Sequence, residues 1–323
     1  MKKRNLAFVV LGAVALTPFL GGGEPAHAQG ISIPTTFPTS IPTIPGLNLP
    51  TALPIPTNLN PPAMLGPLAA SAMHSEVRNV LDELIGHLPT TAASRVKGIP
   101  LKLDPSPTDM NAYAGCDAQG KPFLAGTEGL LHAIFAIAET KACDEIDGAH
   151  SYEAYMAAIT PVLTAQTPGS PQLPPNILPA QCVVDPRVLS RAHEQFDDIA
   201  AFTFGHELAH HYLGHTGCAI NDSPFTQGVA TVEHLSQQII PAVNQPNEIA
   251  ADTAGLYNVM DTGRARRPRF EYSEKGGMEL LDFFARLEGS GGGAIAFSRS
   301  HPPSVTREGW VRTAATTWRL LHP

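Results

Sequence analysis

Apolar residues recur three or four positions apart in several long segments, the spacing that gathers them on one face of a helix. The first such segment spans residues 68–87, and another spans 127–142, where Thr127 is a suitable N-cap. Helices are also expected in the second half of the chain, at 187–215, 247–261, 274–288 and 304–321. The pattern therefore predicts a mainly helical chain.

Three short segments between the first two helices have the composition of strands instead, at 99–103, 111–114 and 122–125. Because they follow one another closely, we expect them to form a small antiparallel sheet. The proline-rich segment 161–186 is expected to be irregular. The predicted fold class is α+β, with one mainly helical domain over residues 68–323.

The N-terminus has the pattern of an export signal. Lys2, Lys3 and Arg4 precede an apolar run, and small residues follow it up to Ala28, so 1–28 is expected to be a cleaved signal peptide. An uncleaved membrane anchor is the alternative, but the run is interrupted by Pro18 and is shorter than the roughly 20 residues that span a bilayer. The mature chain is therefore expected to be periplasmic or secreted, without a transmembrane segment.

Frequent prolines with almost no charge over 29–67 predict an extended linker ahead of the domain. The chain has a net charge of −8, which becomes more negative when the basic signal peptide is removed. Since affinity for nucleic acid comes largely from Lys and Arg on phosphates, this charge argues against a nucleic-acid partner. No other stretch is apolar enough to cross a membrane.

In an exported chain the four cysteines are expected to form two disulfides, because such bonds persist in an oxidising compartment. Three connectivities are possible, and we favour Cys116 with Cys143 and Cys182 with Cys218. A cysteine zinc site is the competing interpretation, but it needs a C-x-x-C spacing that is absent.

The segment GHELAHHYLGH (205–215) holds the strongest chemical signal. His206 and His210 are four positions apart on a predicted helix, so both imidazoles can reach one ion. Glu207 lies on the neighbouring face, where it can hold a water molecule instead of binding metal. This is the HExxH pattern of zinc peptidases, in which three protein ligands leave a position for water.

The third zinc ligand is expected farther along the chain, in the segment NEIAAD (247–252). Glu248 and Asp252 share one helix face, so Glu248 can reach the ion while Asp252 accepts the outward N–H of a liganding histidine. His211 points away from the pair and is expected to be structural. His215 is expected about 180° round the helix from His206, which excludes it from the site. The metzincin pattern is excluded because it needs a glycine seven and a histidine ten positions after the first histidine, and neither is present.

On these residues the chain resembles the gluzincin metallopeptidases of the family that contains HtpX, the CAAX prenyl protease, the mitochondrial OMA protease and soluble periplasmic members. Four segments carry the resemblance: NAYA (111–114) followed by GTEGLL (126–131), HELAHHYLGH, NEIAAD, and SHPP (300–303) followed by Arg307. The resemblance implies that His206, His210 and Glu248 bind one Zn²⁺ and that Glu207 is the general base. It also implies a substrate-binding edge strand at Asn111, Ala112 and Tyr113.

The resemblance leaves His301 and Arg307 with two interpretations each. His301 either steadies the oxyanion or caps the zinc, or it is simply a histidine at a helix entry; Arg307 could instead make a structural ion pair. The chain departs from the family by an insertion at about 143–186, which we interpret as a candidate lid.

We therefore expect an exported zinc-dependent endopeptidase that acts on a protein or peptide. The alternatives are a zinc-stabilised binding or chaperone module of the envelope and a zinc hydrolase with a non-peptide substrate, because fold and metal do not specify a scissile bond.

Overall fold

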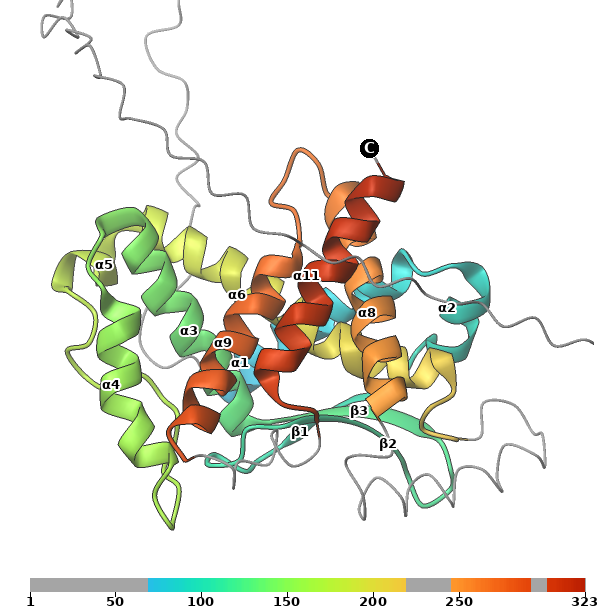
Figure 1. Cartoon of the computed structure of the whole chain (residues 1–323), viewed down its shortest axis with the longest axis horizontal. Coiled ribbons are helices and arrows are strands. Elements are labelled where there is room, and N and C mark those ends of the chain that lie inside the picture. Colours follow the sequence, from blue (N-terminus) through green and yellow to red (C-terminus); the bar gives the residue numbers. More distant parts are fainter. Residues whose placement is uncertain (1–68, 219–244, 292–300, 323) are drawn as a thin grey trace, which may run out of the picture. The chain divides into compact units, whose positions relative to one another are not determined.

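The computed structural model describes residues 69–218, 245–291 and 301–322, all within one compact unit, and it is mainly helical (Figure 1). The expected signal peptide and linker lie outside these ranges. The helices have the following bounds: α1 Ala70–Gly86, α2 Thr90–Val96, α3 Glu128–Asp147, α4 Ser151–Leu163, α5 Ala180–Val184, α6 Pro186–Leu213, α8 Gln245–Ala265, α9 Glu274–Gly289 and α11 Ser304–Leu321. The prediction of a mainly helical α+β fold is confirmed.

Local capping explains where two central helices begin. The Thr127 hydroxyl accepts a hydrogen bond from the backbone N–H of Leu130, so α3 starts directly after the threonine. Asp185 caps α6 in the same way through the N–H of Arg187, and Pro186 occupies the first helical position, where its missing N–H costs nothing.

The prediction that 161–186 is irregular is only partly right. Pro161 lies inside α4, which the sequence did not indicate, and α5 forms a further short helix. Proline is tolerated in α4 because the apolar face of that helix, which includes Tyr155 and Ile159, is buried. Packing of that face therefore offsets the local cost of the proline.

The three predicted strands exist, as β1 Leu101–Asp104, β2 Ala112–Cys116 and β3 Pro122–Thr127, but the sheet is mixed. Strand β2 pairs with β3 as an antiparallel hairpin, whereas β1 pairs with β3 in parallel, in the order β1-β3-β2. The prediction of an antiparallel sheet is wrong because the loop after β1 is held against the start of α3. There the Gly129 N–H donates to Ser106 O and the Thr127 hydroxyl donates to Asp109 O. The loop thus sends β2 to the far side of β3.

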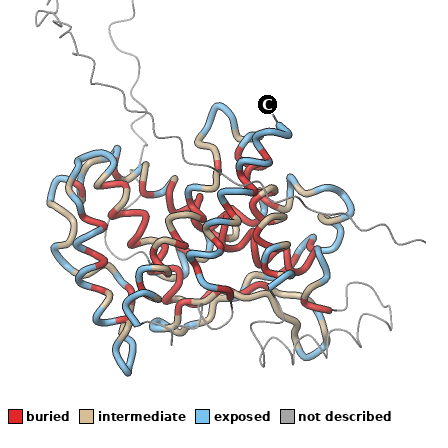
Figure 2. The backbone as a smooth tube through the Cα atoms, viewed as in Figure 1, coloured by how far each residue is buried: buried red, intermediate tan, exposed pale blue. Residues whose placement is uncertain are grey.

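Helix α6 lies at the centre of the molecule. Residues 195–212 are all buried, under contacts from α1, α3, α8, α9 and the sheet (Figure 2). Helices α8 and α9 pack on one part of it, and α11 packs against both of them (Figure 1). The residues that carry the HExxH pattern therefore stand in the core.

Both cysteine pairs differ from the predicted connectivity. The disulfides join Cys116 to Cys218 and Cys143 to Cys182. Cys116 ends β2, whereas Cys143 lies fifteen residues into α3, about 22 Å along its axis, so these two cannot meet. The prediction that cysteines adjacent in the sequence form the disulfides is wrong because a rigid helix holds Cys116 and Cys143 apart.

Within the described ranges, no helix combines the length and the apolar character that a membrane crossing requires.

Candidate metal centre

Helices α6 and α8 bring the predicted ligand residues together. His206 Nε2 lies 3.1 Å from His210 Nε2 and 3.4 Å from Glu248 Oε2, and His210 Nε2 lies 3.4 Å from Glu248 Oε1. Glu248 belongs to the first turn of α8, so it reaches α6 from across the interface. Glu248 follows His210 by 38 positions in the sequence, yet the three side chains converge on one point of the core.

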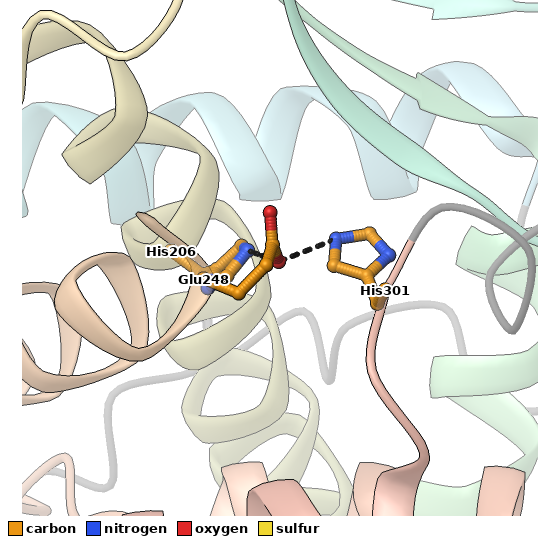
Figure 3. Close-up of side chains that lie close together, drawn as sticks. All are labelled: His206, Glu248 and His301. Carbon is orange, nitrogen blue, oxygen red and sulfur yellow. Dashed lines mark ion pairs between the residues drawn. The ribbon is translucent and has the colours of Figure 1, made fainter. Parts of the chain in front are cut away.

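Two further side chains border this point. His301 Nε2 lies 3.7 Å from Glu248 Oε2 and 3.6 Å from Glu207 Oε1. The Glu248 carboxylate stands between the His206 and His301 rings, and His301 approaches on a separate segment that precedes α11 (Figure 3). One ligand atom each from His206, Glu248 and His301 falls within 4.8 Å of the others. His301 is therefore at the site, whichever of its two interpretations holds.

A buried ion pair fixes the ring of His206. His206 Nδ1 lies 2.8 Å from Asp252 Oδ1, and the Arg307 guanidinium donates to both oxygens of Asp252, at 2.7 and 3.0 Å. A proton on Nδ1 satisfies the Asp252 carboxylate and leaves Nε2, which faces Glu248, as the ring nitrogen available to a metal ion. Arg307 thus makes the structural ion pair that the sequence analysis gave as one possible role for it.

His215 occupies an unexpected position. The helix ends at Leu213, Gly214 adopts a left-handed conformation (φ 83°), and the chain turns back. His215 Nδ1 consequently lies 3.1 Å from His210 Nδ1, with ring centroids 5.1 Å apart. The expected position of His215, on the helix and about 180° from His206, is wrong because the helix ends before this residue. The ring of His215 instead lies against His210 and orients it, as Asp252 orients His206.

His211 is structural, as predicted. It is fully buried, with Nε2 2.9 Å from Phe123 O on β3 and Nδ1 3.0 Å from the Thr216 hydroxyl. It therefore fastens α6 to the sheet and takes no part in the site.

Charges and burial set the protonation of the cluster. Burial and the neighbouring His206 lower the pKa of His210 to about 3, so this ring is neutral. Burial and Arg307 act to lower the pKa of His206, but the carboxylates of Asp252 and Glu248 outweigh them and raise it to about 10.

The three carboxylates of the cluster are ionised. Burial opposes ionisation of Glu207, Glu248 and Asp252, yet neighbouring side chains hold each pKa below its ordinary value: His301 and His206 for the first two, Arg307 and His206 for the third. The site thus gathers negative charge around His206, and a metal ion bound at His206 Nε2 would displace the second proton of that ring.

These residues fit a zinc ion. Zinc–nitrogen and zinc–oxygen bonds of about 2.0 to 2.2 Å place tetrahedral ligand atoms about 3.3 Å apart, close to the 3.1 and 3.4 Å measured between His206, His210 and Glu248. Glu248 Oε2 is fully buried and has no hydrogen-bond partner among the described residues. The nearest nitrogens, on His206 and His301, lie 3.4 and 3.7 Å from this oxygen without forming a hydrogen bond, and a cation between them would satisfy the buried carboxylate.

The expected substrate strand lies at a sheet edge. Ala112 and Tyr113 belong to β2, whose one described neighbour is β3, and Asn111 precedes them directly. The side-chain oxygen of Asn111 is buried without a hydrogen-bond partner in the part of the chain described. The expected insertion contains the end of α3, α4 and α5; its role as a lid remains a prediction.

Comparison with known proteins adds no assignment: the chain matches no protein-family model, and neither a curated protein nor a solved structure matches it. The resemblance to gluzincin peptidases therefore stands on the motifs alone.

Proposed function

We propose that the protein is a zinc-dependent endopeptidase. The observation that carries this proposal is the convergence of His206, His210 and Glu248 at tetrahedral spacing, with the Glu207 carboxylate beside them. A structural zinc site is closed by a fourth protein ligand, which His301 could supply, so it is the free carboxylate of Glu207 that favours a catalytic site. Glu207 is buried and ionised, which suits a general base and has no use in a closed structural site.

Zinc held by these three residues would supply Lewis acidity to a carbonyl and would lower the pKa of water towards 7. Glu207 accepts the proton of the attacking water and delivers it to the leaving amine, so that one carboxylate serves as base and then as acid. Its Oε1 lies 3.8 Å from His206 Nε2, which places it beside the ligand set and not within it.

His301 and β2 complete the proposed machinery. The ring of His301 stands 3.6 Å from Glu207, where it can donate to the developing oxyanion. The edge strand β2 has a row of backbone groups that can pair with an extended peptide. An extended peptide beside β2 is the reason to propose a protein or peptide substrate.

The two disulfides support an exported protein, since such bonds persist in oxidising compartments. We propose, accordingly, that the enzyme acts in the periplasm or outside the cell.

A Glu207→Gln variant tests the function. The mature protein is expected to bind one zinc at His206, His210 and Glu248 and to hydrolyse an unfolded protein in a chelator-sensitive manner. Glu207→Gln should keep that zinc and lose hydrolysis by at least about 100-fold, because the proton carrier is gone. Glu194→Gln makes the same change earlier on α6 and should leave the hydrolysis rate unchanged.

Two results would contradict the proposal. Equal hydrolysis by Glu207→Gln and wild type would remove Glu207 from the chemistry. Zinc binding without any chelator-sensitive hydrolysis in the wild type would favour the envelope binding or chaperone module instead.

A further inference from the structure

A second cluster of potential metal ligands lies on the other half of α6, where α1 packs against it. His193 Nε2 lies 3.0 Å from Glu76 Oε1 and 3.8 Å from Asp197 Oδ1, and the three atoms all fall within 4.8 Å of one another. His193 precedes His206 by thirteen positions on one helix, about 20 Å along the axis. This cluster is therefore separate from the candidate centre described above.

Asp197 is the informative member. The residue is only 8% exposed, and its Oδ1 is fully buried without a hydrogen-bond partner among the described residues. His193 Nε2 can donate one proton, and Glu76 at 3.0 Å is the nearer acceptor. A simple ion pair between Glu76 and His193 thus leaves the buried Oδ1 of Asp197 unsatisfied, at a cost in stability.

The arrangement around the three residues is preorganised. The other oxygen of Glu76 accepts a hydrogen bond from Asn79 Nδ2, which holds the carboxylate in place on α1. His193 and Asp197 are four positions apart on α6, so they present neighbouring side chains on one face. Besides His193, the cation that acts on Asp197 is Arg266, and its guanidinium is bound to Glu83, Tyr272 and the Phe270 carbonyl.

We propose that Glu76, His193 and Asp197 bind a divalent transition-metal cation of the zinc type, which joins α1 to α6. One cation in place of the His193 proton satisfies both carboxylates and balances their two negative charges. The imidazole nitrogen favours a zinc-like ion over calcium or magnesium, which prefer oxygen ligands alone. His193 is exposed, so water can complete the coordination and the ion can enter from solvent.

The cation would act as a brace and not as a catalyst. Helix α1 packs on α6 through a buried apolar face that includes Val77 and Leu84. Because the ligands come from two helices, the ion binds only when those helices are docked, and it stabilises the folded state by mass action.

Metal counting on the full chain tests this inference. The metal-free protein is equilibrated with Zn²⁺ at low micromolar free concentration, and bound zinc per chain is measured by elemental analysis. Two zinc ions are expected in the wild type and one in His193→Ala and in Asp197→Asn. His87→Ala removes another exposed histidine, directly after α1 and outside the cluster, and should keep both ions. The melting temperature should rise with zinc in a His206→Ala variant and stay constant in His206→Ala/His193→Ala.

The outcomes separate this inference from the proposed peptidase centre. Full zinc in both His193→Ala and Asp197→Asn would overturn it, even if His206→Ala lost one ion as the peptidase proposal requires. One ion in the wild type that depends on His206 alone would likewise overturn it. One ion that depends on His193 and not on His206 would support it and contradict the peptidase centre.

Discussion

Gly205 of α6 and Gly255 of α8 face each other where the two helices cross, next to the candidate metal centre. A Cβ on Gly255 would lie 2.8 Å from the carbonyl oxygen of Gly205 and 2.9 Å from the backbone nitrogen of His206. Two helix backbones can approach this closely only where side chains are absent. Because Glu248 lies two turns before Gly255 on the same face of α8, this contact sets the distance from Glu248 to His206.

Gly255→Ala should therefore move Glu248 away from the histidines. The new methyl group meets backbone atoms, which cannot rotate aside, so α8 must shift by several tenths of an ångström. We expect a loss of about 1 to 3 kcal/mol in the free energy of unfolding and at least about a tenfold loss of zinc affinity. Urea denaturation and competitive zinc titration would measure the two effects.

Gly309→Ala is the matched control for this change. Gly309 lies in α11, and nothing stands within 4 Å of the position that an alanine methyl group would take there. Alanine should therefore stabilise the helix slightly, by up to about 1 kcal/mol. If Gly255→Ala behaved like Gly309→Ala, the close crossing would not determine the site.

Asp252→Asn should affect both stability and zinc binding. The amide keeps the shape of the carboxylate but loses the charge that Arg307 faces inside the protein, where both side chains are 1% exposed. We expect a loss of about 3 kcal/mol in the free energy of unfolding without zinc and a 10- to 100-fold loss of zinc affinity, as the ring of His206 is less firmly held.

Asp82→Asn provides the comparison for this prediction, since Asp82 pairs with Arg78 at the surface with 68% of its side chain exposed. Its effect on stability should stay below about 1 kcal/mol. Equal losses of unfolding free energy in the two variants would show that burial of the Arg307–Asp252 pair does not increase its contribution to stability.

The meeting of the side chains at the candidate metal centre could be predicted from the sequence because their signals are local. His206 and His210 share a face through helical spacing, and Glu248 and Asp252 share another, so residue type and an interval of four were enough. The positions of α1, α3, α6, α8, α9 and α11 followed for the same reason, from apolar periodicity, whereas α2, α4 and α5 were not predicted.

The remaining features depend on contacts between distant segments. His215 orients His210 only because the helix ends at Gly214, and the proximity of Gly205 to Gly255 leaves no side-chain signal. The parallel pairing of β1 depends on a loop held by α3, and alternation of apolar residues does not specify strand order. Disulfide connectivity likewise follows from the fold.

Stability should decrease with rising pH through Glu139. This residue lines a cavity of about 180 Å³ between α3 and residues 172–178, is 4% exposed, and has its pKa raised by burial from 4.5 to about 8. A raised carboxyl pKa contributes stability that is complete below pH 4.5 and is lost as pH rises to 8. We expect Glu139→Gln to gain on the order of 5 kcal/mol in the free energy of unfolding relative to wild type between these pH values.

Urea denaturation at several pH values would check this expectation, with Glu153→Gln as the control, because Glu153 has 61% of its side chain exposed. Parallel pH profiles for wild type and Glu139→Gln would contradict it.

The two disulfides should differ in their effect on the proposed activity. Cys116–Cys218 joins the end of β2 to the chain just after α6, whereas Cys143–Cys182 joins α3 to α5, remote in sequence from the metal ligands. Loss of either disulfide should lower the free energy of unfolding by about 4 kcal/mol in the chain-entropy description, since the sequence separations of 102 and 39 differ little on a logarithmic scale.

At a temperature where both variants are folded, Cys116→Ser/Cys218→Ser should lower hydrolysis and zinc affinity, because no covalent bond then joins β2 to the turn that holds His215. Cys143→Ser/Cys182→Ser should keep both, and a larger loss of activity in this second variant would show that the insertion, not the β2 connection, governs the site.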